Sequence, residues 1–101
     1  MSSESVTLVN VLQVESGDCH ELITLLKQNI EQVVCRLKGW KGTRLIAAAD
    51  GLSVVIYSQW ETLAAVEAMR ADPRMQAYFP QISALASMHS IAGEEVFGQG
   101  L

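Results

Sequence analysis

The chain has 101 residues, of which 50% are hydrophobic and 18% are charged, with a formal net charge of −4. Its length predicts one domain, covering residues 1–101 with a core over about 6–97. The high apolar fraction excludes disorder as a description of the whole chain, because disordered chains combine few apolar residues with high net charge. The acidic balance makes nucleic acid and anionic membranes poor candidate partners.

The compartment is expected to be the cytoplasm. No apolar run approaches the ~20 residues that a membrane-spanning helix needs. Residues 1–5 lack the basic start and long apolar segment of a signal peptide. Two cysteines, Cys19 and Cys35, are too few for a disulfide scaffold. We expect both of them to be reduced structural thiols.

The first half of the chain predicts a strand, a helix and a hairpin. Residues 6–14 alternate as in a strand. Ser16-Gly17-Asp18 predicts a turn, and Asp18 with Glu21 resembles a capping box. An apolar stripe at helical spacing predicts a helix over about 19–37, and Gly39 is a natural stop signal after it. Strands are expected over 40–49 and 52–60, joined at Asp50-Gly51 by a two-residue hairpin turn.

The second half predicts two helices and a last strand. A short helix is expected over 62–70, and Asp72-Pro73 is typical of a cap followed by proline in the first turn. Apolar residues recur at helical spacing from there to residue 88. Pro80 either kinks that helix or begins a second piece of it. Residues 89–97 form a weaker fourth strand, in which Gly93 suggests a bulge.

The element order β-α-β-β-α-β predicts an α+β, ferredoxin-like fold with an antiparallel sheet and helices on one face only. The other face needs a cover, because it carries Val9, Val11, Val55 and Tyr57. Packing of two sheets against each other would bury these side chains. The sequence therefore predicts a homodimer through this face, that is, a dimeric α+β barrel.

Three segments resemble a known family: VTLVNV from Val6 with VESG from Val14, LKGW from Leu37, and DGLSVVIYSQWE from Asp50. Together they are similar to the antibiotic biosynthesis monooxygenase superfamily. The resemblance implies a small dimeric barrel that oxidises polycyclic aromatic polyketides, such as anthrones and related phenols. It also implies that a substrate carbanion, formed between sheet and helices, reduces dioxygen directly. No flavin, metal or other cofactor is expected.

Two residues are predicted to be catalytic. Asn10 matches the asparagine of the family's first strand, and it is also the polar residue in an otherwise apolar row of that strand. It would orient the substrate or donate to an oxyanion, or it is simply an amide satisfied by backbone or water. Trp60 matches the tryptophan of the family's third strand. Its indole would donate to a substrate oxygen, or it is a core side chain at a strand end.

Four residues are predicted to bind substrate. Ile56 stands where oxygenases of the family often carry a second asparagine, so the pocket would be more apolar than theirs. Tyr78 and Phe79 lie at helical spacing and would form its walls, and Met69 would let it adapt to different ligands. Core filling is the alternative role for all of these side chains, and also for Met75 and Met88.

Other charged and titratable residues give weaker indications. Arg44 would neutralise an anionic substrate if it faces inward, and is otherwise solvated. His89 would act as a base, although no carboxylate is placed by sequence to orient it. No metal-ligand cluster or nucleotide-binding motif is present. Haem degradation by the same fold is disfavoured, because Met69 and Tyr78 occupy the places of the tryptophan and the haem-ligating histidine.

The sequence thus predicts a cofactor-free monooxygenase that combines a small aromatic or quinol-type molecule with dioxygen. The alternative is a small-ligand-binding or stress-associated barrel without turnover. The two differ in the pocket, because an enzyme needs a cavity that reaches both Asn10 and Trp60. A space filled by Ile56, Met69 and Phe79 would favour the alternative.

Overall fold

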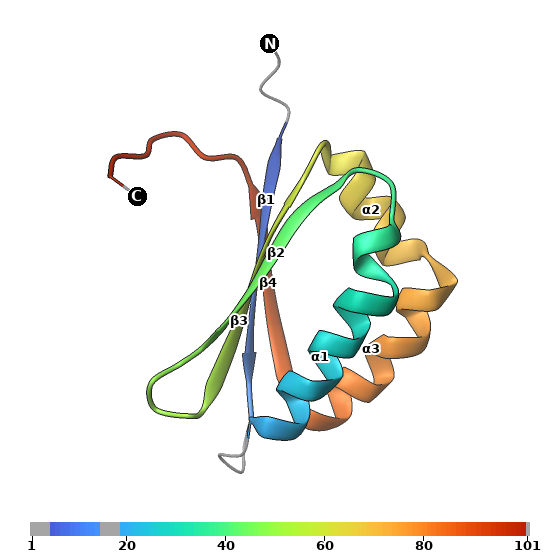
Figure 1. The fold of residues 1–101 in the computed structure, drawn as a ribbon, viewed down its shortest axis with the longest axis vertical. Helices are drawn as coiled ribbons and strands as arrows, with labels where there is room; N and C mark the ends of the chain where they lie inside the picture. Colours follow the sequence, from blue (N-terminus) through green and yellow to red (C-terminus); the bar gives the residue numbers. More distant parts are fainter. Residues whose placement is uncertain (1–4, 15–18, 101) are drawn as a thin grey trace.

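The computed structural model describes residues 5–14 and 19–100, and it shows an α+β sandwich of two layers. The strands pair antiparallel in the order β2-β3-β1-β4. The helices all pack on one face of this sheet (Figure 1). The ferredoxin-like prediction is therefore confirmed. The elements are β1 (Val6–Gln13), α1 (His20–Gln32), the 3-10 helix η1 (Val34–Arg36), β2 (Trp40–Ala47), β3 (Ser53–Trp60), α2 (Leu63–Ala71), α3 (Pro73–Leu85) and β4 (Ser87–Gly93).

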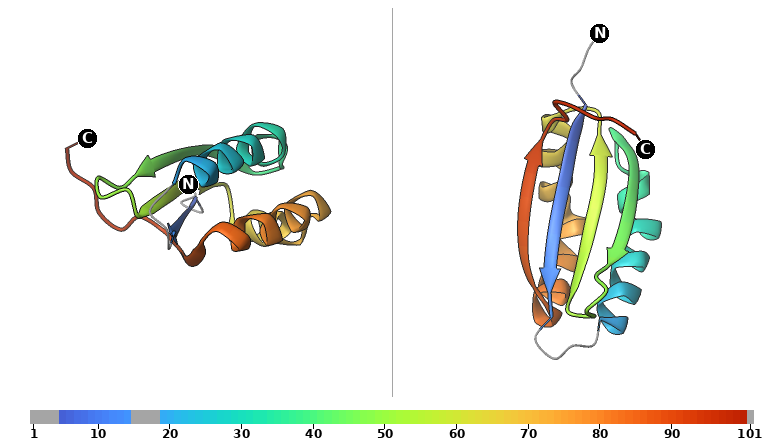
Figure 2. Two further views of the ribbon diagram at one scale, coloured as in Figure 1. Left: turned by 90° about the horizontal axis from the view of Figure 1, so that it is seen from below. Right: turned by 90° about the vertical axis from the view of Figure 1, so that its left-hand side faces the viewer.

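Alternation in the two central strands sorts their side chains between the faces. The face under the helices, called the inner face, holds Leu8, Leu12, Val54 and Trp60, all of which are at most 2% exposed. The opposite, outer face holds Val9, Val11, Val55 and Tyr57, as the pairing register requires. Within the part of the chain that the structure describes, no helix covers this outer face, and the C-terminal segment crosses it only at one end (Figure 2).

The first helix ends earlier than the sequence predicts. α1 stops at Gln32, because Val33 adopts a non-helical conformation with φ −125° and ψ −61°, and η1 follows. Gly39 then turns the chain into β2 with φ +89°, a value that favours glycine. A Cβ on Gly39 would lie 2.5 Å from the Cβ of Ala65. The expected capping residue Asp18, with its turn, lies outside the described residues.

The hairpin between β2 and β3 is wider than predicted. Ala48 N–H donates to Ser53 O, and Gly51 N–H donates to Ala48 O. Gly51 has φ +76°, but Asp50 does not have a positive φ. The two-residue prediction is wrong, because the tight turn expected for Asp-Gly needs a positive φ at both residues. Asp50 instead accepts from Leu52 N–H at 2.9 Å through Oδ1.

The fourth strand also differs from expectation. β4 runs over Ser87–Gly93 rather than 89–97, and it pairs with β1 without a register shift. The bulge predicted at Gly93 is therefore absent, and an irregularity lies instead between Trp40 and Gly42 on β2. Beyond β4 the described chain makes no further strand, and Val96 and Phe97 are 91% and 77% exposed.

Two side-chain caps fix the joint between the later helices. Thr62 Oγ1 accepts from Ala65 N–H at 3.1 Å at the start of α2. Asp72 Oδ1 accepts from Arg74 N–H at 2.8 Å at the start of α3, with Pro73 in its first turn, as predicted. Pro80 lies inside α3, which continues through it as one helix. Within the described ranges, no helix is long and apolar enough to cross a membrane.

Candidate functional site

A partly enclosed cavity of about 80 Å³ lies between the inner face of the sheet and the helices. Side chains from β1, β3 and β4 form one wall, and side chains from α1, α2 and α3 form the other. The lining is mostly apolar, with a few polar groups that converge on one space. That is the usual composition of a small-molecule site.

Asn10 lies at the centre of the sheet wall. It is half-buried, and its partners in the strand register are Ile56 on β3 and Ser90 on β4. The Ser90 hydroxyl donates to Asn10 Oδ1 through a short hydrogen bond. Among the described residues, the Asn10 amide nitrogen has no protein acceptor, so its N–H groups remain available to a ligand.

Asn29 supplies a second amide from the helical wall, and the sequence analysis did not single it out. It is 5% exposed, lines the cavity, and donates from Nδ2 to the Met75 sulfur at 3.4 Å. A signal was available, because position 29 follows Leu22 and Leu26 at the spacing of the buried stripe of α1. A polar residue in such a stripe is unusual, and it indicates a site or a structural amide.

Most of the predicted binding residues meet at this cavity. Ile56, Met69 and Phe79 all line it, together with Met75 and Met88. Tyr78 is half-buried where the two core clusters meet, and it is not part of the lining. The structure thus brings Asn10, Ile56, Met69 and Phe79 together. The roles assigned to them stay predictions.

Trp60 lies in the adjacent core rather than in the cavity. Its side chain is 1% exposed and packs in a cluster with Leu8, Val66 and other apolar residues. The indole N–H donates to Ser58 Oγ at 3.2 Å. Leu8, Met69 and Met75 belong to this cluster and also line the cavity, so they connect the tryptophan's cluster with the cavity.

The rim of the cavity carries Arg70 at the end of α2, with Met88 and Ser90 on β4, and all three are exposed. The opening therefore lies between α2 and the edge strand. The basic and titratable residues that the sequence suggested lie elsewhere. Arg44 pairs with Tyr57 and His89 pairs with Val11, which places both on the outer face. Arg44 is exposed in the single chain.

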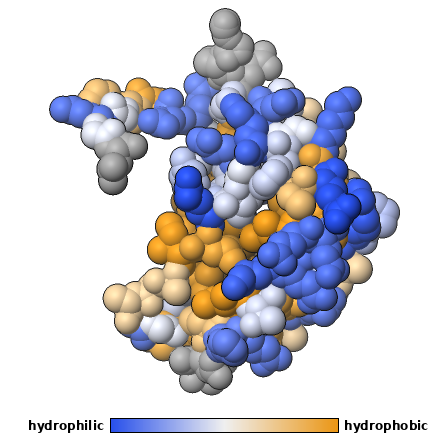
Figure 3. All heavy atoms as spheres, in the orientation of Figure 1, coloured by the Kyte–Doolittle hydropathy of each residue, from blue (hydrophilic) through white to orange (hydrophobic). Residues whose placement is uncertain are grey.

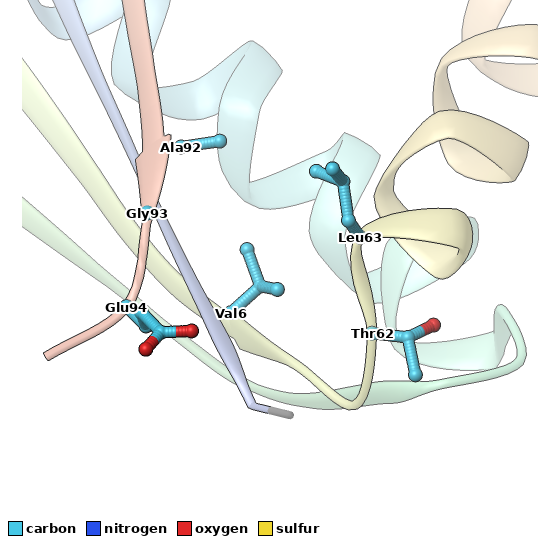
Figure 4. Close-up of a pocket in the computed structure, with 6 residues that line it drawn as sticks. All are labelled: Val6, Thr62, Leu63, Ala92, Gly93 and Glu94. Atoms are coloured by element: carbon cyan, nitrogen blue, oxygen red, sulfur yellow. The ribbon is translucent and has the colours of Figure 1, made fainter. Parts of the chain in front are cut away.

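A second hollow, of about 360 Å³, lies between the end of β4 and the start of α2 (Figure 4). Val6, Leu63 and Ala92 point into it, and the hydroxyl end of Thr62 points away. That hydroxyl already caps α2, and Glu94 is the charged residue of the lining. Although it is the larger space, it contains none of the predicted site residues and no convergent set of polar groups.

Metal binding finds no support in the described part of the chain. It contains no group of three or more His, Cys, Asp or Glu side chains placed to hold a metal ion. The candidate site is therefore the central cavity, with its amides from β1 and α1, its methionine-rich walls and its basic rim.

Comparison with known proteins decides the family. Residues 5–81 match the family model described as antibiotic biosynthesis monooxygenase. The chain belongs to this family. A relative from Streptomyces glaucescens, tetracenomycin-F1 monooxygenase, is 37% identical over 78 residues, which span 77% of this chain and 70% of the relative.

Solved structures with the same fold include two that are named as oxygenases. The cofactor-independent oxygenase SnoaB from Streptomyces nogalater has a TM-score of 0.86 at 20% identity, covering 94% of this chain and 96% of SnoaB. The monooxygenase from the gene ActVA-Orf6 of Streptomyces coelicolor, solved with the ligand nanaomycin D, has a TM-score of 0.84 at 23% identity. That match covers 98% of this chain and 93% of the other. At these identities the likeness establishes the fold.

Proposed function

We propose that this antibiotic biosynthesis monooxygenase family member is a cofactor-independent monooxygenase for a small aromatic, polyketide- or quinol-type substrate. The observation that carries the proposal is the central cavity, where an available Asn10 amide faces apolar walls beneath the helices. The relationship to a monooxygenase at 37% identity supports it.

The reaction needs little covalent chemistry from the protein. An activated C–H of the substrate loses a proton to water, and the carbanion gives one electron to dioxygen. The substrate radical and superoxide then combine, and the peroxide takes up a proton to form a hydroperoxide. Loss of water then leaves a ketone, so one oxygen atom enters the product and the other leaves as water. Asn10 N–H groups would stabilise the negative charge on the substrate oxygen. This electrostatic interaction is stronger in an apolar cavity than in water.

The cavity must widen to admit an aromatic ring. Its volume of about 80 Å³ is smaller than the ~150 Å³ of a cavity that binds benzene. Met69, Met75 and Met88 supply the necessary adaptability, because methionine side chains are unbranched and flexible. Displacement of the first two would expose Trp60 to the ligand. Tyr78 and Phe79 would then form the walls.

A binding protein without turnover is the second candidate function. It is supported by Ile56, which places an apolar side chain opposite Asn10 in the register where a second amide would strengthen oxyanion binding. The position of Trp60 outside the cavity lining supports it as well. Asn29 argues against it, because it supplies an amide to the same cavity from α1.

Oxygen uptake distinguishes the two candidates. Purified protein, without added metal or flavin, is tested against anthrones, hydroquinones and naphthols, and substrate-dependent uptake is expected. Asn10→Ala should abolish most of it, whereas Gln32→Ala, which removes an exposed amide at the end of α1, should not. Trp60→Phe should likewise lower the oxygen uptake, whereas Trp40→Phe should not. Ligand binding without uptake in the wild type would contradict the oxygenase and establish the second candidate.

We also propose that two copies pair through the outer face. Val9 and Tyr57 are register partners there, flanked by Ile91 on β4, and Val11 and Val55 form the next row. Ile46 and Ile91 are 52% and 58% exposed in the single chain. Such exposed apolar side chains on one sheet face are typical of an interface. Figure 3, which looks onto the β2 edge of the sheet, shows hydrophobic residues along that edge beside a more hydrophilic helical surface.

The mass in solution tests the pairing. Light scattering should give twice the chain mass for the wild type. Val11→Glu should give the single-chain mass, because it buries a charge in the centre of the interface. Thr24→Glu, on the exposed surface of α1, should leave the dimer intact. A wild type with single-chain mass at high concentration would contradict the dimer.

The cytoplasmic location stays a prediction. Both cysteines are free, Cys19 being half-buried and Cys35 exposed. Reducing compartments such as the cytoplasm keep thiols free, so this state agrees with the prediction.

A further inference from the structure

Arg70 is the charged residue of the candidate site. Among the described residues that line the central cavity, it alone carries an ionisable side chain. It lies in the last turn of α2, where the partial negative charge of the helix end favours a cation. Its side chain is exposed at the rim, so the guanidinium is hydrated and accessible from outside.

No carboxylate of the described chain occupies this guanidinium. The nearby Arg74 is bound by Asp72 at 3.0 Å, with a second bond from its Nε to the same carboxylate. Arg70 has no such ion pair within the described ranges. Its backbone is fixed, because Gln76 Nε2 donates to Arg70 O at 2.5 Å and so joins the end of α2 to α3.

The rest of the cavity accepts an anion without repulsion. Its remaining polar side chains are Asn10, Asn29 and Ser90, all of them neutral, and the others are apolar. An aromatic body would fill the space among Met69, Met75 and Phe79. An acidic group on that body would remain at the rim, where water and Arg70 both reach it.

We propose that Arg70 binds an anionic oxygen group of the aromatic substrate, a carboxylate or an ionised phenol, and thereby selects acidic over neutral aromatics. This inference rests on the proposed function of the cavity and names its substrate class. The planar guanidinium forms two parallel hydrogen bonds to a carboxylate, which an ammonium group does not reproduce. At a partly solvated rim we expect the interaction to be worth about tenfold in affinity.

Binding of matched ligands tests the proposal. The dissociation constants of 2-naphthoate and of the neutral 2-naphthamide are measured by calorimetry on the full chain. The wild type should bind the carboxylate about tenfold more tightly. Arg70→Gln should remove that preference, and Arg70→Lys should retain part of it. Arg36→Gln removes an exposed cation that lines no part of the cavity, and should leave the preference unchanged.

The same ligands separate the two anionic groups. If an ionised phenol is the preferred group, the affinity for 2-naphthol should rise as pH increases through its ionisation, and Arg70→Gln should abolish the rise. In either case the preference should weaken as salt is added, because salt screens an exposed charge. Equal affinities for acidic and neutral ligands, or a preference that survives in Arg70→Gln, would overturn the proposal.

Oxygen uptake, measured separately, keeps this inference apart from the oxygenase proposal. A preference for acids that Arg70→Gln removes, without uptake for any substrate, would leave Arg70 as a binding determinant and sink the oxygenase. Oxygen uptake that depends on Asn10 but is equal for acidic and neutral substrates would support the oxygenase and overturn the role of Arg70. If both proposals hold, Arg70→Gln should raise KM for acidic substrates and change kcat little.

Discussion

The two faces of the central strands both carry apolar side chains, but they differ in what covers them. On the inner face, Leu8, Leu12 and Val54 are at most 2% exposed beneath the helices. On the outer face, Val9, Val11 and Val55 are half-buried, and none of the described helices lies above them. Adjacent apolar residues of one strand, such as Val54 and Val55, thus lie in two environments, one beneath the helices and one uncovered.

This difference shows how the fold divides two tasks. The inner face stabilises the chain and contains the cavity, because helices from the same chain close over it. The outer face has no cover within the described chain, so its apolar side chains are available to a second copy. Four sets of substitutions, taken from the largest expected effect to the smallest, test this division and the joint between the later helices.

Trp60→Ala should cause the largest loss of stability. The side chain is 1% exposed and sits at the centre of an inner-face cluster. Its removal should lower the free energy of unfolding by about 3–5 kcal/mol, measured by urea denaturation. Trp40→Ala should cost clearly less, because Trp40 is half-buried and its indole donates to Thr43 at 2.8 Å near the strand end. Equal losses would mean that the inner cluster is not the main core.

Val54→Ala and Val55→Ala compare the two faces directly, since they alter the same residue type at adjacent positions of β3. Val54 is 0% exposed on the inner face, so its truncation should cost about 2 kcal/mol at any protein concentration. Val55 lies on the outer face, and its truncation should cost less in the single chain. The Val55 effect should therefore grow with protein concentration if a second copy covers this face.

Ile56→Asn, on the inner face, should lower the stability of the fold and raise the affinity for a ligand. The new amide would stand opposite Asn10 and line the cavity. We expect a loss of about 2 kcal/mol in unfolding free energy and about tenfold tighter binding of a phenolic ligand. Leu45→Asn is the matched control, because Leu45 neighbours Ile56 on β2 but does not line the cavity. An equal gain with Leu45→Asn would show that the cavity is not the binding site.

Asp72→Ala should have the smallest effect, because it changes a half-buried cap at the joint between α2 and α3, outside the core clusters. The hydrogen bond from the Arg74 side chain lowers the pKa of Asp72 below its usual value, so the ionised carboxylate contributes stability at neutral pH. That contribution should disappear as pH falls to the ordinary pKa of aspartate and below it. The melting temperatures of wild type and variant should therefore differ slightly at pH 7 and converge in acid. A difference that grows in acid would contradict this assignment.

Local patterns predicted most of the secondary structure. The period of two in residues 6–14 and 52–60 locates both central strands, and Asp72-Pro73 locates the start of α3. The errors occur where tertiary contacts override local preference. α1 ends at Gln32, where Val33 leaves the helical conformation and η1 follows before the chain enters β2.

The candidate site was only partly predictable. Asn10 is conspicuous because a polar residue interrupts an apolar row, and the structure does place it at the cavity. Asn29, Arg70 and Ser90 line the same space, but they come from three different elements, and no sequence spacing relates them. Trp60 matches the tryptophan of the family's third strand, yet whether its side chain lines the cavity depends on how the helices pack.

The sequence by itself determined the element order, the alternation that gives the sheet two apolar faces, and the family. These properties follow from neighbouring residues, whose side-chain directions are set by the period of a strand or a helix. Only the tertiary structure decided which face the helices cover, how small the cavity is, and that Arg70 forms no ion pair with the described residues at the cavity rim. Such features depend on packing between segments that are distant in the chain, and local periodicity carries no information about that packing.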